Sequence, residues 1–345
     1  ILLDGVPAYD ASGISGAFDL NFIAVDQVER VEILKGSQST LYGSDAIAAV
    51  IHIISKKGGS KKLNANATLA AGTYGTFRAD VGAGGTISKT NYNVQYSKIY
   101  SNGFSTAIDQ AGNKGFDKDG IDENIFRAGI NQKINDKIAL RLNTQLSNYK
   151  TDADAGPFTD DADYTITTKN SLVGFGADYT FGKSVLHFNY NYTGKSYFVE
   201  LYSNIGVTKN IDVLVGIDYR NQLTDQNYFS VSMFGPYSST PLGDDSAKVN
   251  QFGAYASFIL KDLKGFNLEL GGRYNNFNKY GDVFTFSFNP SYVIKNCFKI
   301  FGNISSGFKA PSLYQVYSEY RNPYNELKPE RSMSFEGGVQ YYRNN

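Results

Sequence analysis

Residues 138–147 read IALRLNTQLS, in which apolar and polar side chains alternate. Isoleucine or leucine stands at positions 138, 140, 142 and 146, whereas Arg141, Asn143 and Gln145 fill the positions between them. A period of two is that of a β-strand, because successive side chains point to opposite faces. The pattern therefore predicts strands with one apolar face and one polar face.

The same alternation recurs in residues 185–192, 266–275 and 284–294. About fourteen such segments of about ten residues follow residue 63, and ten residues is the length of a tilted strand that crosses a bilayer. The chain has no run of about 18 apolar residues that would form a transmembrane helix. We therefore predict a membrane β-barrel.

The connections between the predicted strands alternate in length. Short polar turns alternate with long loops. The turns lie at residues 88–91, 135–137, 181–184 and 262–265, and the loops lie at residues 101–120, 150–169, 222–249 and 308–330. Short turns at one end and long loops at the other are typical of outer-membrane barrels. A soluble β-sandwich or a β-helix would also alternate, but interfacial girdles explain the many aromatic residues at strand ends and favour the barrel.

Composition excludes several classes of protein. The 345 residues include 33 basic and 33 acidic side chains, so the net charge is zero, and a nucleic-acid binder with a basic surface is not expected. The single cysteine, Cys297, excludes a disulfide framework within the chain and a metal site made of several cysteines. The 26 Tyr, 24 Phe and 35 Gly fit a barrel with aromatic girdles and many turns.

The first 59 residues do not continue the two-residue alternation of the predicted barrel strands. A charged strand pattern at 25–34 (VDQVERVEIL) precedes a Gly/Ser loop, a short helical stretch near 41–47 and the apolar run at 48–54. A polar, Gly-rich linker follows at 56–62. We expect a small α+β domain over residues 1–59 and the barrel strands over residues 60–345.

Two sets of motifs resemble those of TonB-dependent outer-membrane receptors. The first comprises 3–7 (LDGVP), 28–36 (VERVEILKG) and 41–54 (LYGSDAIAAVIHII), and is similar to the second half of that family's plug domain. The second comprises 307–313 (GFKAPSL), 322–323 (NP) and 327–330 (LKPE), and looks like the family's barrel motif. The resemblance implies an all-β, 22-stranded antiparallel barrel with the plug inside its lumen. About fourteen strands would then be present, so we expect part of a longer protein, with the C-terminal part of the plug only.

Three charged residues of the plug motif, Glu29, Arg30 and Glu32, lie together on a predicted strand. Charges of this kind would be costly in an apolar core but are accommodated in a wet lumen. We expect them to contact the inner wall of the barrel, and a solvated strand face is the alternative.

The segment at 12–20 is similar to the apical plug loop of the cobalamin-receptor branch. The resemblance implies that this loop faces outward and touches the ligand. The predicted binding residues are Tyr9, Asp10, Ser12, Ile14, Ser15 and Phe18, with the loop aromatics Tyr317 and Tyr320 as further candidates.

Two long outward loops are rich in aspartate. Hard cations such as calcium take six to eight oxygen ligands, mostly carboxylates and carbonyls. An EF-hand is excluded, because the glycine comes too early and Ala128 stands at the twelfth position. In the cobalamin-receptor branch the corresponding loops bind calcium, and a solvated acidic loop is the alternative. The predicted ligands are Asp117, Asp119, Asp152, Asp154, Asp160, Asp161 and Asp163.

No catalytic constellation accompanies these motifs. The two histidines, His52 and His187, are not placed with a nucleophile and a carboxylate, so an enzyme is not expected. The resemblance implies active transport of cobalamin or a related corrinoid, with a siderophore as the alternative ligand. The implied partners are a TonB-type inner-membrane energy complex, outer-membrane lipid and, as a further candidate, a surface lipoprotein; nucleic acid is not one of them.

Overall fold

The computed structural model describes residues 1–10, 13, 16, 18–112, 115–194, 196–225, 227, 229–232, 235–238, 242–243, 246–295, 297–318 and 326–342. Within them, fourteen strands form one antiparallel sheet in which each strand pairs with its neighbours in chain order. The strands are β5 (Asn64–Ala71), β6 (Phe77–Ile87), β7 (Thr90–Ser101), β8 (Ile121–Lys133), β9 (Ile138–Asp152), β10 (Thr165–Phe181), β11 (Ser184–Thr193), β12 (Ser196–Gly206), β13 (Ile211–Leu223), β16 (Lys248–Leu263), β17 (Phe266–Phe277), β18 (Gly281–Ile294), β19 (Phe298–Lys309) and β20 (Glu330–Tyr341). The predicted fourteen strands are thus confirmed.

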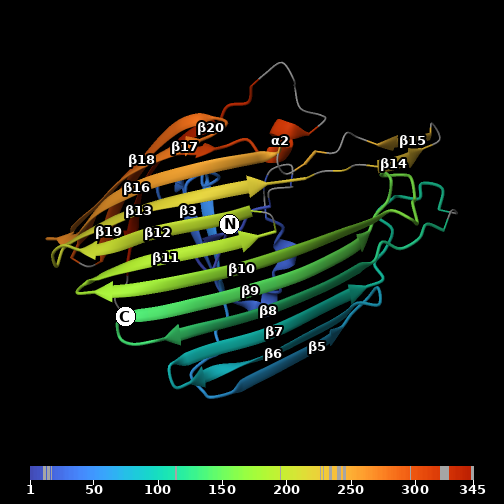
Figure 1. The fold of residues 1–345 in the computed structure, drawn as a ribbon, viewed down its shortest axis with the longest axis horizontal. Helices are drawn as coiled ribbons and strands as arrows, with labels where there is room; N and C mark the ends of the chain where they lie inside the picture. The colour runs from blue at the N-terminus through green and yellow to red at the C-terminus, as the bar shows by residue number, and fades with distance from the viewer. Residues whose placement is uncertain are drawn as a thin grey trace.

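The sheet curves into a wall that partly encloses the N-terminal segment (Figure 1). Among the described strands, β5 and β20 are the two edges, and each pairs with one neighbour only. Long connections join the strands at the right-hand end of the view in Figure 1, and short turns join them at the left. A small hairpin, β14 (Phe229–Ser232) and β15 (Gly235–Ser238), forms within the connection between β13 and β16.

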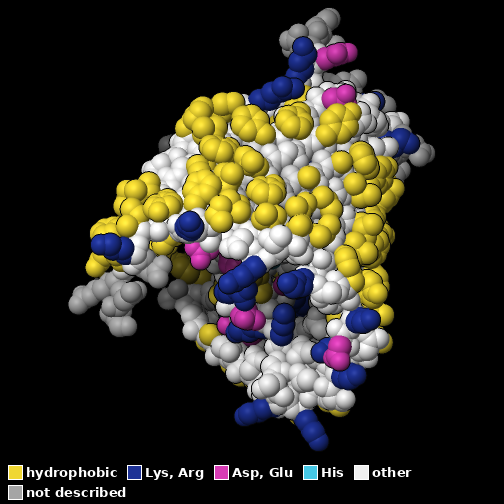
Figure 2. All heavy atoms as spheres, turned by 90° about the vertical axis from the view of Figure 1, so that its left-hand side faces the viewer, with side chains coloured by type: hydrophobic (Ala, Val, Ile, Leu, Met, Phe, Trp, Pro, Cys, Tyr) yellow, Lys and Arg dark blue, Asp and Glu magenta, His cyan; other side chains and the backbone are white. Residues whose placement is uncertain are grey.

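The two faces of the wall differ as the alternation predicts. On β9, Leu142 and Leu146 are 48% and 49% exposed on the outer face, whereas Gln145 on the inner face is 1% exposed. Hydrophobic side chains cover the outer surface in Figure 2, and charged side chains gather in the hollow behind it. An apolar outside and a polar inside are the arrangement of a barrel in lipid.

The N-terminal residues form a four-stranded sheet of their own, in the order β2-β1-β4-β3. The turn between its first two strands is Asp4-Gly5, with φ of 51° and 89°. Two positive φ angles in succession are what a tight two-residue hairpin requires, and Asp-Gly is a favoured pair for it. The strands are β1 (Leu2–Leu3), β2 (Val6–Pro7), β3 (Val28–Lys35) and β4 (Ala49–Ser55).

Short helices complete the chain. The turns η1 (Leu20–Phe22) and η2 (Val25–Gln27) precede β3, and α1 (Ser39–Tyr42) separates β3 from β4. The helix α2 (Leu313–Tyr317) lies in the connection between β19 and β20, where Ser312 and Gln315 form a capping box. Among the described residues, no helix has the length and apolar character needed to cross a membrane.

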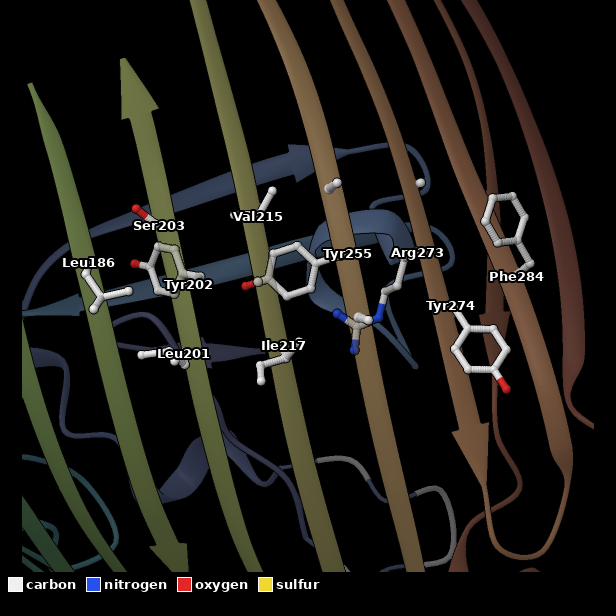
Figure 3. Close-up of a pocket in the computed structure, with 14 residues that line it drawn as sticks. Leu186, Leu201, Tyr202, Ser203, Val215, Ile217, Tyr255, Arg273, Tyr274 and Phe284 are labelled. Carbon is white, nitrogen blue, oxygen red and sulfur yellow. The ribbon is translucent and has the colours of Figure 1, made fainter. Parts of the chain in front are cut away.

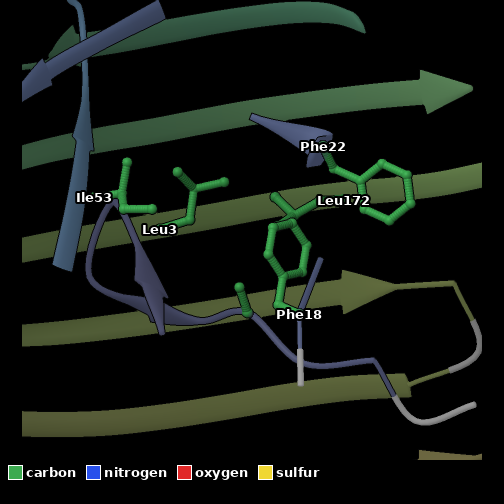
Figure 4. Close-up of a cluster of buried hydrophobic side chains, with 6 residues drawn as sticks. Leu3, Phe18, Phe22, Ile53 and Leu172 are labelled. Carbon is green, nitrogen blue, oxygen red and sulfur yellow. The ribbon is translucent and has the colours of Figure 1, made fainter. Parts of the chain in front are cut away.

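Apolar clusters hold the N-terminal domain against the inner wall. In one of them Leu3, Phe18, Phe22 and Ile53 pack with Leu172 of β10 (Figure 4). A second cluster near the long-loop end consists of wall and loop residues, and Tyr9 of the N-terminal domain packs against it; its buried members are Val249, Phe277, Val283, Phe308 and Leu313. The N-terminal domain is therefore seated in the wall by side chains from both partners.

Candidate functional site: plug apex, inner wall and outer loops

Tyr9 lies between the plug and the wall. Its ring packs against the cluster around Phe308, and the guanidinium carbon of Arg220 on β13 is 5.9 Å from the ring centroid. Burial, followed by the charge of Asp45, raises the pKa of the Tyr9 hydroxyl, so the group stays neutral. Asp10 follows at the start of the apical loop, where its backbone N–H donates to the Gly16 carbonyl at 3.3 Å. The predicted roles of Tyr9 and Asp10 in ligand binding stay predictions.

The structure corrects the interpretation of Phe18. This side chain is 5% exposed and meets the ring of Phe22 edge-on, with centroids 5.9 Å apart. A ring buried in the cluster between plug and wall cannot also be offered to a ligand, so we assign Phe18 a packing role. Three further predicted residues of this loop, Ser12, Ile14 and Ser15, lie outside the described residues, as does Tyr320.

Tyr317 ends α2 and faces the same apolar cluster as Tyr9. Its hydroxyl donates to the Lys248 carbonyl at 3.3 Å, and the Lys279 ammonium is 5.5 Å from its ring centroid. The structure thus brings two predicted aromatic residues, from the two ends of the chain, to the sides of one cluster near the outer loops. The predicted contact of Tyr317 with the ligand stays a prediction.

The acidic loops come together in part. Asp117, from the loop after β7, and Asp154 and Asp160, from the loop after β9, place carboxylate oxygens within 4.8 Å of one another. A hydrogen bond with Asp160, followed by burial and the surrounding negative charges, raises the pKa of the Asp117 carboxyl. Its Oδ1 atom is buried and receives no hydrogen bond within the described part of the chain. This donor set fits a hard cation.

The other predicted ligands lie around this cluster with partners of their own. Asp119 accepts a hydrogen bond from the Thr106 N–H, and Asp152 accepts one from the Thr165 hydroxyl. The Asp161 N–H donates to Asp154 at 3.1 Å, and the Asp163 N–H donates to Asp161 at 3.2 Å. Asp163 is exposed at the rim of the loop. These four residues are not brought into the three-carboxylate group.

Ion pairs tie the plug to the wall. Arg127 of β8 pairs with Asp4 in the first plug turn, and Ser55 donates to the same carboxylate at 2.8 Å. Arg78 of β6 pairs with Asp26 of η2 at 2.8 Å. Sequence analysis missed these pairs, although the inward register of Arg78 and Arg127 on their strands was the signal that could have found them.

Within the described residues, the charges of strand β3 pair with one another. Arg30 pairs with Glu29 at 3.3 Å and with Glu32 at 2.8 Å, and its side chain is 54% exposed. Arg30 and Glu32 stand two positions apart on one strand face, where their opposite charges attract each other. The fourteen described strands do not close around the N-terminal domain, so the predicted contact of these charges with the inner wall and its solvated-face alternative both stay predictions.

A polar cavity of about 260 Å³ separates the plug from the middle of the wall. Tyr42 and His52 line it from the plug, and Glu200, Arg220 and Arg273 line it from the wall. The Tyr255 hydroxyl donates to Glu200 at 2.8 Å, and Arg273 donates to Asp218 at 2.6 Å. Hydrogen bonds with neighbouring side chains thus fix the orientation of Glu200 and Arg273 at this cavity.

A second hollow, of about 620 Å³, opens on the lipid-facing side of β12, β13, β16 and β17 (Figure 3). Small residues at Ala254, Ala256 and Gly272 form its floor, and Leu201 and Phe284 are among its apolar rims. Its position on the outer face separates it from the plug and the outer loops. We therefore place the candidate site on the inner side of the wall.

Comparison with known proteins identifies the family. A model described as "TonB dependent receptor-like, beta-barrel" matches residues 59–345, and one described as "TonB-dependent Receptor Plug Domain" matches residues 1–50. The chain belongs to the TonB-dependent receptor family. The protein is therefore an outer-membrane protein, and this family consists of transport receptors rather than enzymes.

Individual relatives are named for two kinds of ligand. The vitamin B12 transporter BtuB of Vibrio vulnificus is 26% identical over 360 aligned residues, which cover 98% of this chain and 55% of that protein. The siderophore receptor PirA of Acinetobacter baumannii has a TM-score of 0.78 at 18% identity, covering 99% of this chain and 60% of its own. The ferric enterobactin receptor PfeA of Pseudomonas aeruginosa gives 0.74 at 16% identity, with 99% and 62% coverage.

These likenesses differ in what they establish. At 16–18% identity the solved receptors show a shared fold, and the chain spans little more than half of the length of the relatives it matches. For this TonB-dependent receptor the fold and the family are therefore fixed, while the ligand has to be argued from the site.

Proposed function

We propose that this receptor chain captures cobalamin or a related corrinoid at the outer face and takes part in its import. The observation that carries the proposal is a plug seated against the inner wall, beneath outer loops that gather three carboxylates at one point. The similarity to a vitamin B12 transporter along 98% of the chain supports the corrinoid as ligand.

Import also requires a source of energy. Within the described ranges, separate ion pairs and an apolar cluster hold the plug against the wall. Such discrete contacts can be broken in sequence by a pull from the periplasmic side. We therefore propose a TonB-type inner-membrane complex as the energy-coupling partner.

Calcium is proposed as the ion of the outer loops. Asp117, Asp154 and Asp160 would supply three carboxylate ligands from two different loops, and an ion shared by both loops would tie them together. Like charges at this spacing repel each other, so a divalent cation lowers the free energy of the folded loops.

The test is equilibrium binding of cyanocobalamin to the purified full-length receptor, with calcium and with a chelator. We expect saturable binding that weakens about tenfold when calcium is removed, the size of a typical coupling between two sites. A ferric catecholate chelate is titrated in parallel. Saturable binding of the chelate without binding of cyanocobalamin would identify a siderophore receptor and overturn the corrinoid proposal.

A matched pair of variants isolates the ion site. Asp160→Asn removes a carboxylate of the cluster, whereas Asp163→Asn removes one from the exposed rim of the same loop. We expect Asp160→Asn to weaken calcium binding about tenfold, because charge count sets the affinity of such sites. Asp163→Asn should leave it unchanged, as measured by titration calorimetry with calcium alone. Equal affinities for both variants would show that the cluster does not hold the ion.

A further inference from the structure

Strands β7 to β10 lie side by side in the wall (Figure 1). Their register places polar residues in a row across the lipid-facing surface. The strand register pairs Lys98 with Asn124, Asn124 with Asn148, and Asn148 with Lys169. Residues paired in this way stand at one level of the sheet, about 4.8 Å apart from strand to strand. The two lysines therefore end a continuous row of amides.

The row faces outward. The chain neighbours of these residues are inward and buried, with Ser97 2%, Glu123 6% and Ser147 5% exposed. Because side chains alternate between the two faces of a strand, the row itself lies on the lipid side. Lys169 and Asn148 are exposed, and Lys98 and Asn124 are half-buried.

The levels above and below the row differ in character. Tyr96, Phe126 and Leu146 are paired one step toward the periplasm, and they are 40%, 37% and 49% exposed on the same face. One step toward the outer loops, Asp122 is paired with Lys150. This order matches that of a lipid in the outer leaflet, whose acyl chains lie below its charged headgroup.

The row borders a hollow. A groove of about 410 Å³ on this face is lined by Tyr96, Phe126, Leu146, Asn148 and Lys169, among others. The Tyr96 hydroxyl at its side donates to the Asn124 side chain at 2.8 Å, which fixes the amide. The groove thus combines an apolar floor with amides and an ammonium group at its outer end.

The charge of the patch is positive. Lys98 forms an ion pair with Asp122, while Lys150 and Lys169 are exposed and make no ion pair within the described ranges. Three lysines and one aspartate leave an excess of two positive charges. Lys98 lies three residues before the end of β7, which places it about 10 Å below the outer loops, at the headgroup level of the outer leaflet.

We propose that this patch, formed by Lys98, Lys150, Lys169, Asn124 and Asn148, binds the phosphate-bearing headgroup of an outer-leaflet glycolipid. The lysines contact the phosphate, the amides contact the sugar hydroxyls, and an acyl chain lies along Phe126 and Leu146. The occupant is a lipid rather than a soluble anion, because the apolar floor of the groove continues directly from the charged level into the lipid-facing band. The proposal does not depend on which ligand the receptor imports.

The test is native mass spectrometry of the full-length receptor in detergent, titrated with bis-phosphorylated lipid A. We expect the Lys98→Gln/Lys150→Gln/Lys169→Gln variant to bind at least about tenfold more weakly, because each lysine near an anionic headgroup contributes severalfold to binding. Replacing the same three lysines with arginine should keep the affinity. Dephosphorylated lipid A, with the same acyl chains, should bind the native protein as weakly as lipid A binds the glutamine variant.

The control variant is Lys133→Gln/Lys137→Gln, which removes lysines from the opposite, short-turn end of the same strands. It should bind lipid A as the native protein does, and circular dichroism shows that each variant is folded. Native affinity in the triple glutamine variant would overturn the proposal. So would equal binding of phosphorylated and dephosphorylated lipid A, or displacement of the lipid by an equal concentration of inorganic phosphate.

Discussion

Arg273 is a buried cation on the inner wall, and its surroundings show how this lumen holds charge. Its guanidinium donates to Asp218 at 2.6 Å and to Asn275 at 2.8 Å, and it lies 5.2 Å from the ring centroid of Tyr255. The side chains of Arg273 and Asp218 are 2% and 3% exposed. A pair so well enclosed has lost its hydration and depends on each partner for compensation.

Removing one partner of this pair should destabilise the fold strongly. We expect Asp218→Ala to lower the free energy of unfolding by about 3–5 kcal/mol, because it leaves the Arg273 charge buried and unpaired. Urea unfolding followed by circular dichroism measures the change. Asp136→Ala, in a short-turn ion pair with Lys133 whose side chains are 97% and 57% exposed, is the control and should cost little, because exposed ion pairs contribute little to stability. Equal losses in both variants would show that the inner wall is hydrated around Arg273.

Individual side chains also show where reasoning from sequence stops. The alternation predicted that Arg141 and Gln145 face inward, and they do, since alternation depends only on the local strand. Phe18 was interpreted as a ligand contact because the segment at 12–20 is similar to an apical plug loop, yet its ring is buried against Phe22 and Leu172. Its burial depends on a contact with β10, more than 150 residues away, which no local pattern contains.

At the level of elements, β9 carries the clearest separation of faces. Its lipid-facing residues from Ile138 to Leu146 are apolar apart from Thr144, and Leu142 stands in the middle of this band. The adjacent Asn143 faces inward and lines a small cavity together with Arg127 and Arg141. Strand faces were predictable because a one-residue slip of register would exchange lipid for lumen along the whole strand.

A charge placed on the two faces of β9 should therefore have different effects. We expect Leu142→Arg to cost about 2–4 kcal/mol of folding free energy in a bilayer, the range for arginine at the midplane of a barrel. Asn143→Asp, at the same depth, adds a charge beside two arginines and should be tolerated. The measurement is the fraction folded in lipid vesicles as a function of urea, read from the gel mobility of the unheated protein. A tolerated arginine at 142 would contradict the lipid-facing assignment.

At the scale of the whole molecule, the plug is tied to the wall by contacts between distant parts of the chain. Asp4 and Arg127 are 123 residues apart, and the Ser39 hydroxyl accepts a hydrogen bond at 3.2 Å from the N–H of Phe308, 269 residues away. The sequence predicted a plug and a wall but not which charges join them. Any inward carboxylate and any inward arginine would satisfy the same pattern, and only the packed structure selects a pair.

These contacts allow a test of whether the plug must move during import. The side chains of Ser37 in the plug and Ser332 on β20 both face Gly307, so their hydroxyl groups lie close together. In a Cys297→Ser background, Ser37→Cys with Ser332→Cys should form a disulfide that joins plug and wall. Because the predicted ligand contacts lie elsewhere, on Tyr9 and the outer loops, the oxidised protein should bind its ligand with unchanged affinity. It should lose uptake, since the plug can no longer leave the wall.

Uptake of labelled cyanocobalamin by cells that express the full-length variant is the measurement, with and without a reducing agent. Reduction should restore uptake, and each single cysteine variant should import normally under both conditions, which separates the effect of the cross-link from that of the substitutions. Binding measured on the same cells shows that the outer loops remain intact. Normal uptake by a fully cross-linked population would mean that the ligand passes while Ser37 and Ser332 stay joined, and would overturn the prediction that this contact between plug and wall must open during import.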